Sequence, residues 1–200
     1  MIRKNHLFCN LIRIKNSSNI LIRNFMMSFN PHKEVCPICG RTGDCVPFAS
    51  YDRYIIDFVC GSTVSSTFTI TRIKCSCGHT HAILPDPLIP YDQYSLFFIL
   101  HVLMEYYLRL LTVSELCDRF DISISTLYRW KALFDEHCRE WLGLLTFMEQ
   151  SRSSSLKKLI RLDPYSDFAA FFFRKTGLSF MQSHKNPSHS PRSMLPPDHV

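Results

Sequence analysis

The sequence predicts an α+β protein in which an N-terminal zinc ribbon of short antiparallel strands precedes a helical bundle that contains a helix-turn-helix. Three observations predict this fold. Two cysteine pairs, CPICG at 36–40 and CSCG at 75–78, each end in glycine and flank runs rich in β-branched and aromatic residues. A long apolar segment with helical periodicity then follows a proline-rich bend. Two further amphipathic patterns, each with a capping residue, are separated by only a few residues.

Composition divides the 200 residues into parts of different character. The net charge is +6, but five bases and no acid lie in the first 30 residues, so the rest of the chain is nearly neutral. The charge of the chain is therefore weak support for a nucleic-acid partner. The first part reads as a disordered basic extension or a translation start assigned too far upstream, with an organelle transit peptide as the alternative. The expected parts are this extension (1–30), the zinc ribbon (31–91), the helix-turn-helix domain (92–145), a C-terminal helical segment (146–182) and a disordered tail (183–200).

The cysteine content indicates a reducing compartment. There are nine cysteines, an odd number, and no convincing secretory signal precedes them. Disulfide frameworks belong to oxidising compartments, so a metal site or buried free thiols are favoured, and a cytoplasmic location is expected.

The two cysteine pairs predict one structural zinc site. Two thiolates separated by one or two residues can face the same ion when the chain turns sharply, and the glycine that follows can leave the turn with positive φ. Four thiolates meet the tetrahedral preference of zinc, and such a closed site stabilises folding rather than supporting catalysis. The simplest ligand set is four cysteines, although a neighbouring histidine can replace one of them: Cys36, Cys39, Cys75 and Cys77, with His79 and His81 as the alternatives.

Two short strands are expected between the pairs, at 54–59 and 67–73. The second alternates apolar and polar residues, so that Phe68, Ile70 and Arg72 share one face. A cysteine pair, two strands and a second cysteine pair, in this order, are the layout of a zinc ribbon.

The apolar segment at 95–111 predicts a core helix that begins after Asp92 as its cap, because three prolines prevent helix before that point. Its length is near the lower limit for a membrane span. However, His101, Glu105 and Arg109 recur every four residues, and three ionisable groups in so short a span are costly in lipid. We therefore expect no membrane partner, and an ion-pair row on the solvent side of this helix.

The next segment predicts a helix-turn-helix. Thr112 and Glu115 have the spacing of a capping box. Asp121 tolerates the left-handed conformation that a tight turn requires, and Ser123 can cap a second helix that begins near Ile124.

The start of the second helix is the predicted DNA-binding surface. If its apolar stripe faces the core, polar side chains at the start of the helix face outward, where a recognition helix meets base edges and phosphates. Between 112 and 142 four bases stand against six acids, so binding by this unit alone should be weak. A helical bundle with a solvated face is the alternative. The candidate DNA-binding residues are Ser123, Ser125, Thr126, Tyr128, Arg129 and Lys131.

Three segments, CPICG, RIKCSCGHTHAILPDPLIPY and LTVSELCDRFDISISTLYRW, together resemble an uncharacterised bacterial family that is associated with insertion sequences. The resemblance covers about residues 34–145 and implies a zinc ribbon joined to a transposase-type helix-turn-helix in a bacterial cytoplasm. It also implies that Cys36, Cys39, Cys75 and Cys77 are the ligands and that Tyr128, Arg129 and Trp130 lie in the second helix. It implies no activity.

The leading functional hypothesis is therefore a non-catalytic DNA-binding accessory or remnant protein of a mobile element, with double-stranded DNA as partner and structural Zn²⁺ as the cofactor. One alternative is an adaptor that contacts a transposase or a polymerase. The other is an active transposase. An enzyme is not expected, because the carboxylates are scattered and neither a nucleophile motif nor a phosphate-binding loop is present in the sequence.

Overall fold

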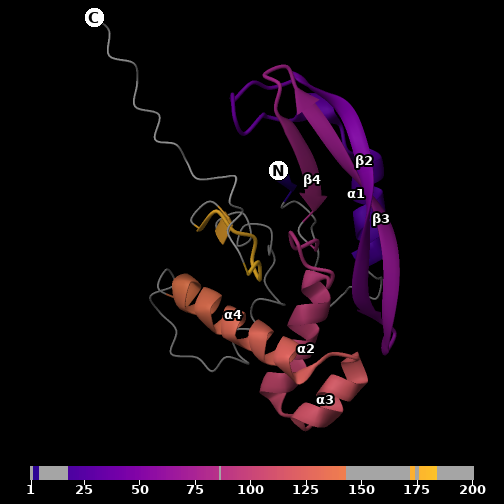
Figure 1. Ribbon diagram of the computed structural model, residues 1–200, viewed down its shortest axis with the longest axis vertical. Coiled ribbons are helices and arrows are strands. Elements are labelled where there is room, and N and C mark those ends of the chain that lie inside the picture. The colour runs from indigo at the N-terminus through magenta and orange to yellow at the C-terminus, as the bar shows by residue number, and fades with distance from the viewer. Residues whose placement is uncertain (1, 5–17, 86, 143–171, 174–175, 184–200) are drawn as a thin grey trace, which may run out of the picture.

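The computed structural model describes residues 2–4, 18–85, 87–142, 172–173 and 176–183. Over these residues the protein is α+β, with a three-stranded antiparallel sheet to which a short fourth strand is added in parallel, giving the order β1-β4-β3-β2. Figure 1 shows the long hairpin of β2 and β3 on one side of the molecule and helices α2, α3 and α4 at its lower end. The elements are β1 (Ile2–Lys4), α1 (Ser18–Ser28), the 3₁₀ helix η1 (Pro31–Lys33), β2 (Cys45–Val59), β3 (Ser62–Cys75), β4 (Thr80–Pro85), α2 (Leu96–Leu108), α3 (Val113–Phe120) and α4 (Ile124–Leu142).

The β2–β3 hairpin is much longer than the short strands that the sequence predicted. Its strands have 15 and 14 residues, and pairing continues from Cys45–Cys75 at one end to Val59–Ser62 at the other. The connecting turn has positive φ at both Cys60 (51°) and Gly61 (85°), as in a type I′ turn, whose twist matches that of the flanking strands. Cross-strand contacts between polar side chains extend the ladder beyond its apolar core; Thr69 donates a hydrogen bond to Asp52 (2.8 Å).

The turn end of the hairpin packs on the helices. The Phe58 ring contacts those of Phe98 and Phe120, with centroids 6.5 and 4.7 Å apart. Ser95, at the start of α2, donates a side-chain hydrogen bond to Asp57 (2.8 Å). The half-buried Arg53 guanidinium donates to the backbone carbonyls of Ile89 and Asp92. The hairpin and the helices therefore share one hydrophobic core rather than being separated by a linker.

Helix α2 begins later and ends earlier than predicted. Ser95, rather than Asp92, is its N-cap, because the Ser95 hydroxyl accepts the Phe98 amide (3.0 Å) while the Asp92 carboxylate accepts the Tyr94 amide (3.0 Å) within the preceding turn. The helix ends where Arg109 adopts the left-handed conformation (φ 54°).

The expected ion-pair row on α2 forms only in part. The contact between His101 and Glu105, one turn apart, is present at 3.1 Å. Glu105 is buried rather than solvent-facing and also binds Arg119 at 3.1 Å, while Arg109 takes the C-cap position. Arg119 comes from α3, so this interaction joins two helices, which spacing within one helix could not reveal.

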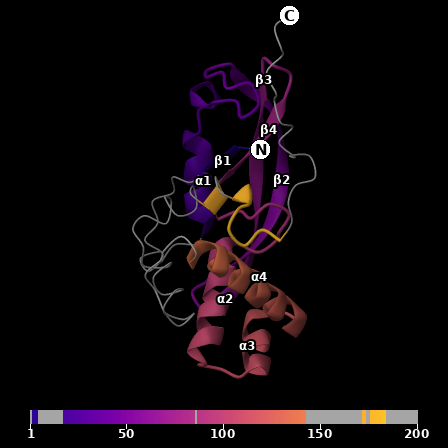
Figure 2. The same ribbon diagram turned by 90° about the vertical axis from the view of Figure 1, so that its left-hand side faces the viewer.

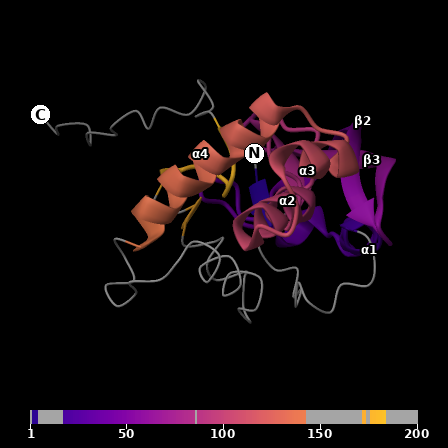
Figure 3. The ribbon, with the colours of Figure 1, turned by 90° about the horizontal axis from the view of Figure 1, so that it is seen from below.

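The predicted caps of the next two helices are confirmed. Thr112 and Glu115 form a capping box at the start of α3, and Asp121 ends that helix in the left-handed conformation (φ 50°). The Ser123 hydroxyl accepts the Thr126 amide (3.2 Å) at the start of α4. Figure 3 shows α2, α3 and α4 packed against one another on one side of the sheet.

Residues 18–28 do not form the disordered extension that the sequence predicted. They form α1, and Ile22 is fully buried against Phe68 and Ile70 of β3. Phe25 and Phe29 pack on the buried cluster beside the cysteines. Figure 2 shows α1 alongside the sheet. Apolar residues at helical spacing produce this packing, although the basic, acid-free composition of the segment had suggested disorder.

The described C-terminal residues close one side of the helical core. Phe172, Phe180 and Met181 are buried there, and the Met181 amide donates to Nδ1 of His137 (3.2 Å). Residues 146–171 of the predicted C-terminal helical segment and 184–200 of the predicted tail lie outside the described residues. Where the structure describes the chain, every helix is too short or too polar to cross a bilayer.

Candidate functional site

The two cysteine pairs come together at the end of the hairpin where Cys45 pairs with Cys75. Figure 1 shows helices α2, α3 and α4 at the lower end of the molecule, beside the turn of the hairpin. Cys36 and Cys39 lie in the loop between η1 and β2, whereas Cys75 ends β3 and Cys77 lies in the turn before β4. Because Cys45 pairs with Cys75 in the ladder, the hairpin itself brings the two loops to one edge of the sheet.

Each pair sits in a tight turn that a glycine completes. The Gly40 amide donates to the Cys36 carbonyl and the Gly78 amide to the Cys75 carbonyl, both at 2.9 Å. Both glycines have positive φ, 72° and 88°, as the sequence predicted.

The four predicted sulfurs have the spacing of tetrahedral ligands. All lie within 4.8 Å of one another; Cys36 and Cys77 are 3.7 Å apart, and Cys39 and Cys75 are 3.6 Å apart. Thiolates bound at about 2.3 Å to a tetrahedral ion would be separated by roughly 3.8 Å. The donor set therefore fits a four-coordinate metal ion, and this cluster is a candidate metal centre.

The two neighbouring histidines lie beside the sulfur cluster. Nε2 of the buried His81 is 3.4 Å from the sulfur of Cys36, and Nδ1 of the exposed His79 is 3.5 Å from that of Cys77. Each ring is thus placed to donate a hydrogen bond to a ligand sulfur, which is how groups around a metal site orient its ligands.

The thiols of the cluster titrate unequally. The Cys77 backbone amide donates to the Cys75 sulfur and, together with hydrogen bonds from the neighbouring thiols, lowers the pKa of Cys75 to about 6. A hydrogen bond from the His79 backbone amide lowers the pKa of Cys77, but burial and the hydrogen bonds that its thiol donates to neighbouring sulfurs outweigh this effect and raise the pKa of Cys77 to about 12. The thiolate form is therefore favoured at Cys75 over Cys77 without a cation, and a divalent cation at the centre would favour the thiolate form of its ligands.

A polar bridge that sequence reasoning missed joins the two loops. Ser76 donates to the Asp44 carboxylate (2.8 Å), and the Arg41 guanidinium reaches both Ser76 (3.1 Å) and Asp44 (3.4 Å). Arg41 and Ser76 are 35 positions apart, so local patterns carry no signal for this contact.

The other described cysteines do not belong to the cluster. Cys45 is buried next to it, and burial raises the pKa of its thiol to about 11. Cys60 is exposed in the hairpin turn, and Cys117 is buried in the helical core.

The predicted DNA-binding residues line the outer side of the first turns of α4. Leu127 and Trp130 are buried. Tyr128 and Arg129, which lie between them, and Ser125, which precedes them, are exposed. Hydroxyls gather at the start of the helix, where Ser123 contacts both Ser125 and Thr126 at 2.9 Å.

The two predicted cations of α4 differ in their surroundings. Lys131 forms an ion pair with Asp135 (2.8 Å), which also accepts a hydrogen bond from Tyr107 (2.9 Å). Arg129 takes part in none of the ion pairs found among the described residues. Its positive charge is therefore the more available of the two.

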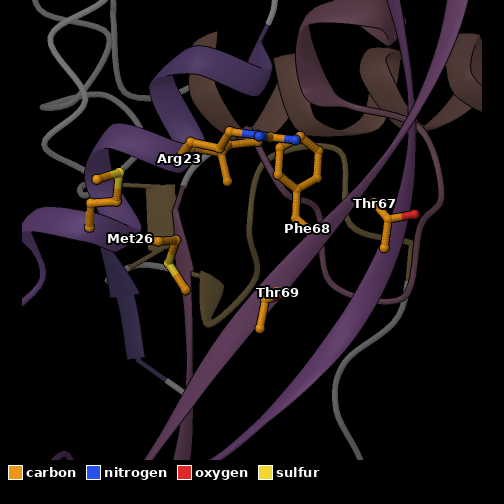
Figure 4. Close-up of a pocket in the computed structure, with 7 residues that line it drawn as sticks. Arg23, Met26, Thr67, Phe68 and Thr69 are labelled. Atoms are coloured by element: carbon orange, nitrogen blue, oxygen red, sulfur yellow. The ribbon is translucent and has the colours of Figure 1, made fainter.

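A hollow of about 370 Å³ lies between α1 and β3 (Figure 4). Arg23 and Met26 face Phe68 across it, with Thr67 and Thr69 on the strand. Arg23 is the one ionisable group among its lining residues, so the hollow lacks the paired titratable groups of acid–base chemistry.

Comparison with family models gave a match to a domain of unknown function (DUF6431) over residues 36–130. The matched segment runs from the first cysteine of the cluster to the buried tryptophan of α4. Comparisons with curated proteins and with solved structures gave no match.

Proposed function

We propose that this protein is a non-catalytic DNA-binding accessory or remnant protein of a mobile element. In this proposal a structural zinc ion holds a zinc ribbon together, and α3 and α4 form a helix-turn-helix whose second helix enters the major groove. The observation that carries the proposal is the exposed row of Ser125, Tyr128 and Arg129 opposite the buried Leu127 and Trp130.

The donor chemistry supports zinc as the ion. Four cysteine thiolates in a tetrahedral arrangement are typical of structural zinc sites, and softer thiolate ligands disfavour magnesium or calcium. Protein side chains supply all four ligands, which leaves no position for a substrate or a reactive water. The expected role of zinc is therefore to stabilise the fold.

The geometry of α4 supports contact with duplex DNA. Arg129 can bind the edge of guanine through two hydrogen bonds or bind a phosphate. Hydroxyls and free backbone amides at a helix N-terminus bind phosphates, so Ser123, Ser125 and Thr126 are placed to position the helix. Tyr128 packs edge-on against Tyr106 of α2 (6.5 Å), which limits the freedom of its ring on this surface. Lys131 contributes less than Arg129, since Asp135 neutralises it.

The association with a mobile element rests on the resemblance of the ordered motifs to the insertion-sequence-associated family. The matched domain spans both the cysteine cluster and the start of α4, which supports treating the two parts as one functional unit.

The proposal is tested by selecting binding sites from a random duplex pool and measuring affinity by fluorescence anisotropy over a salt series. The wild-type protein should bind with a shallow salt dependence, since few phosphates are neutralised. Arg129→Ala should weaken binding to the selected site by roughly 1–3 kcal/mol, the discrimination that a good bidentate base contact provides.

Arg23→Ala is the matched control, because it removes one positive charge from an exposed position on another helix, α1. It should leave affinity almost unchanged. Absence of duplex binding at low salt, or equal losses in both variants, would contradict the proposal. Capture of a protein partner that survives nuclease treatment, without duplex binding, would favour the adaptor alternative.

A further inference from the structure

The hairpin carries a bulge close to the cysteine cluster. Pro47 pairs with Ile73 and Ala49 pairs with Arg72, so Phe48 is an extra residue without a partner on β3. Bulges bend a strand and change the direction of a side chain, and they are common next to functional sites. The Phe48 side chain is 53% exposed, which is unusual for a phenylalanine in a paired strand.

Two cations lie over this ring. The guanidinium carbon of Arg72 is 5.9 Å and the ammonium nitrogen of Lys74 is 5.7 Å from the centroid of Phe48. Residues 72 and 74 project from the same side of β3, while Ile73 between them is buried on the other side. On β2, exposed Val46 lies opposite Lys74, and exposed Tyr51 lies opposite Ile70, two residues before Arg72. These five residues, Val46, Phe48, Tyr51, Arg72 and Lys74, form a surface that we call the aromatic–basic patch.

The charges of the patch are available to an anionic ligand. Arg72 donates a hydrogen bond to the Thr80 hydroxyl (2.9 Å), a neutral acceptor that leaves its charge in place. Neither Arg72 nor Lys74 belongs to an ion pair among those found in the described part of the chain. The neighbouring Asp44 is instead engaged by Arg41 and Ser76.

We propose that the aromatic–basic patch binds unpaired DNA, with a base stacked on Phe48 and phosphates neutralised by Arg72 and Lys74. Sites for single strands combine cations that follow the backbone with aromatic rings on which bases stack. The two cations are roughly 7 Å apart along the strand, so they can meet different phosphates. Bases in a duplex keep their faces covered, which is why an exposed ring favours an unpaired strand. The choice of DNA over another polyanion rests on the proposed function.

The test measures fluorescence anisotropy of the full chain with labelled oligothymidylate of 20 nucleotides and, separately, with a duplex of equal length. Phe48→Ala should weaken binding to the single strand by roughly five- to 150-fold, whereas Phe48→Tyr should retain most of it. Arg72→Gln with Lys74→Gln should reduce the slope of log affinity against log salt by about 1.4. Metal content and circular dichroism check that each variant is folded.

Tyr54→Ala is the matched control, since Tyr54 is an exposed aromatic residue of β2 outside the patch that contacts Ser65 rather than the cations. It should bind oligothymidylate as the wild type does. No binding of oligothymidylate at low salt, equal losses for Phe48→Ala and Tyr54→Ala, or binding of polyglutamate but not oligothymidylate would overturn the proposal.

Failure here is distinguishable from failure of the proposed function, because the two surfaces lie on different elements. Arg129→Ala should affect the duplex and leave oligothymidylate binding unchanged. Duplex binding without single-strand binding overturns only the role of the patch, whereas the reverse result overturns only the role of α4.

Discussion

The two ends of the β2–β3 hairpin are stabilised in different ways. At the helical end the described buried cluster contains seventeen residues, among them Trp130, Phe98 and Phe120. At the cysteine end the buried cluster contains five, and three of these are cysteines. A cluster of five residues buries too little apolar surface to order several loops, so under the proposed function this end is expected to depend on a zinc ion bound by the four cysteines. The helical end has a core large enough to fold by packing.

Removal of the metal should have the largest effect and should be confined to the cysteine end. Structural zinc contributes about 10–16 kcal/mol of apparent binding free energy in small domains. Cys36→Ser with Cys39→Ser should abolish stoichiometric zinc, measured by elemental mass spectrometry, and should increase amide hydrogen exchange at residues 36–46 and 73–81. Amides of α2 and α3 should stay protected.

Cys60→Ser is the control for metal removal, because Cys60 is an exposed thiol at the other end of the hairpin. It should retain full zinc content. Unchanged zinc in the double variant, or equal loss of protection in the helices, would break the distinction between the two ends.

Truncation in the helical core should have the next largest effect. Phe120 is fully buried between the rings of Phe58 and Phe98. Phe120→Ala should lower the free energy of unfolding, measured in urea by circular dichroism, by about 3–5 kcal/mol while zinc stays bound. Tyr128→Ala, on the exposed side of α4, should cost far less. Release of zinc from Phe120→Ala would show that both ends unfold as one unit.

Acid should weaken the helical end through His137. Burial lowers the pKa of this histidine to about 4, and its Nδ1 accepts the Met181 amide, which requires the neutral ring. Because the folded pKa lies below the unfolded value, the contribution of His137 is fully present above about pH 6.5 and is lost as the pH falls toward 4. The loss amounts to about 3 kcal/mol.

His137→Gln removes the titrating group and keeps an acceptor. The difference in unfolding free energy between wild type and this variant should therefore depend on pH between 6.5 and 4. A constant difference over that range would rule out His137 as the acid-sensitive group.

The smallest effect is expected at the cap of α3. Thr112 and Glu115 exchange hydrogen bonds, with Thr112 donating its amide (2.9 Å) and accepting that of Glu115 (3.3 Å). Thr112→Ala should cost about 1 kcal/mol of unfolding free energy, and Thr112→Ser should retain most of it. A loss equal to that of Phe120→Ala would mean that the cap supports more than one helix.

The caps of α3 and α4 were predicted correctly, whereas the cap and the bounds of α2 were not. The capping box, the left-handed Asp121 and the Ser123 cap are short-range interactions, so a few consecutive residues carry the signal. At α2, Asp92 and Ser95 both have capping side chains, and the sequence alone did not decide between them. The turns at Gly40 and Gly78 were predicted for the same reason. Convergence of the cysteines was predictable because thiolates recur at metal-ligand spacing, even though the pairs are distant in sequence.

What the sequence did not predict depends on contacts between distant segments. The length of the hairpin, the bulge at Phe48 and the ion pair of Glu105 with Arg119 are all set by residues on two elements. The packing of α1 was missed because the basic character of residues 1–30 was given more weight than Ile22 and Phe25, whose partners lie on the sheet.

The long hairpin also determines how far apart the two ends can act. β3 has 14 residues, which at about 3.4 Å per residue corresponds to roughly 45 Å. One strand of B-DNA advances about 3.4 Å per nucleotide along the helix axis, so this length equals roughly 13 base pairs. Under the two proposals above, the hairpin separates the duplex contact at α4 from the single-strand contact at the aromatic–basic patch, and removal of two paired residues from each of β2 and β3 should shorten that separation by about 7 Å.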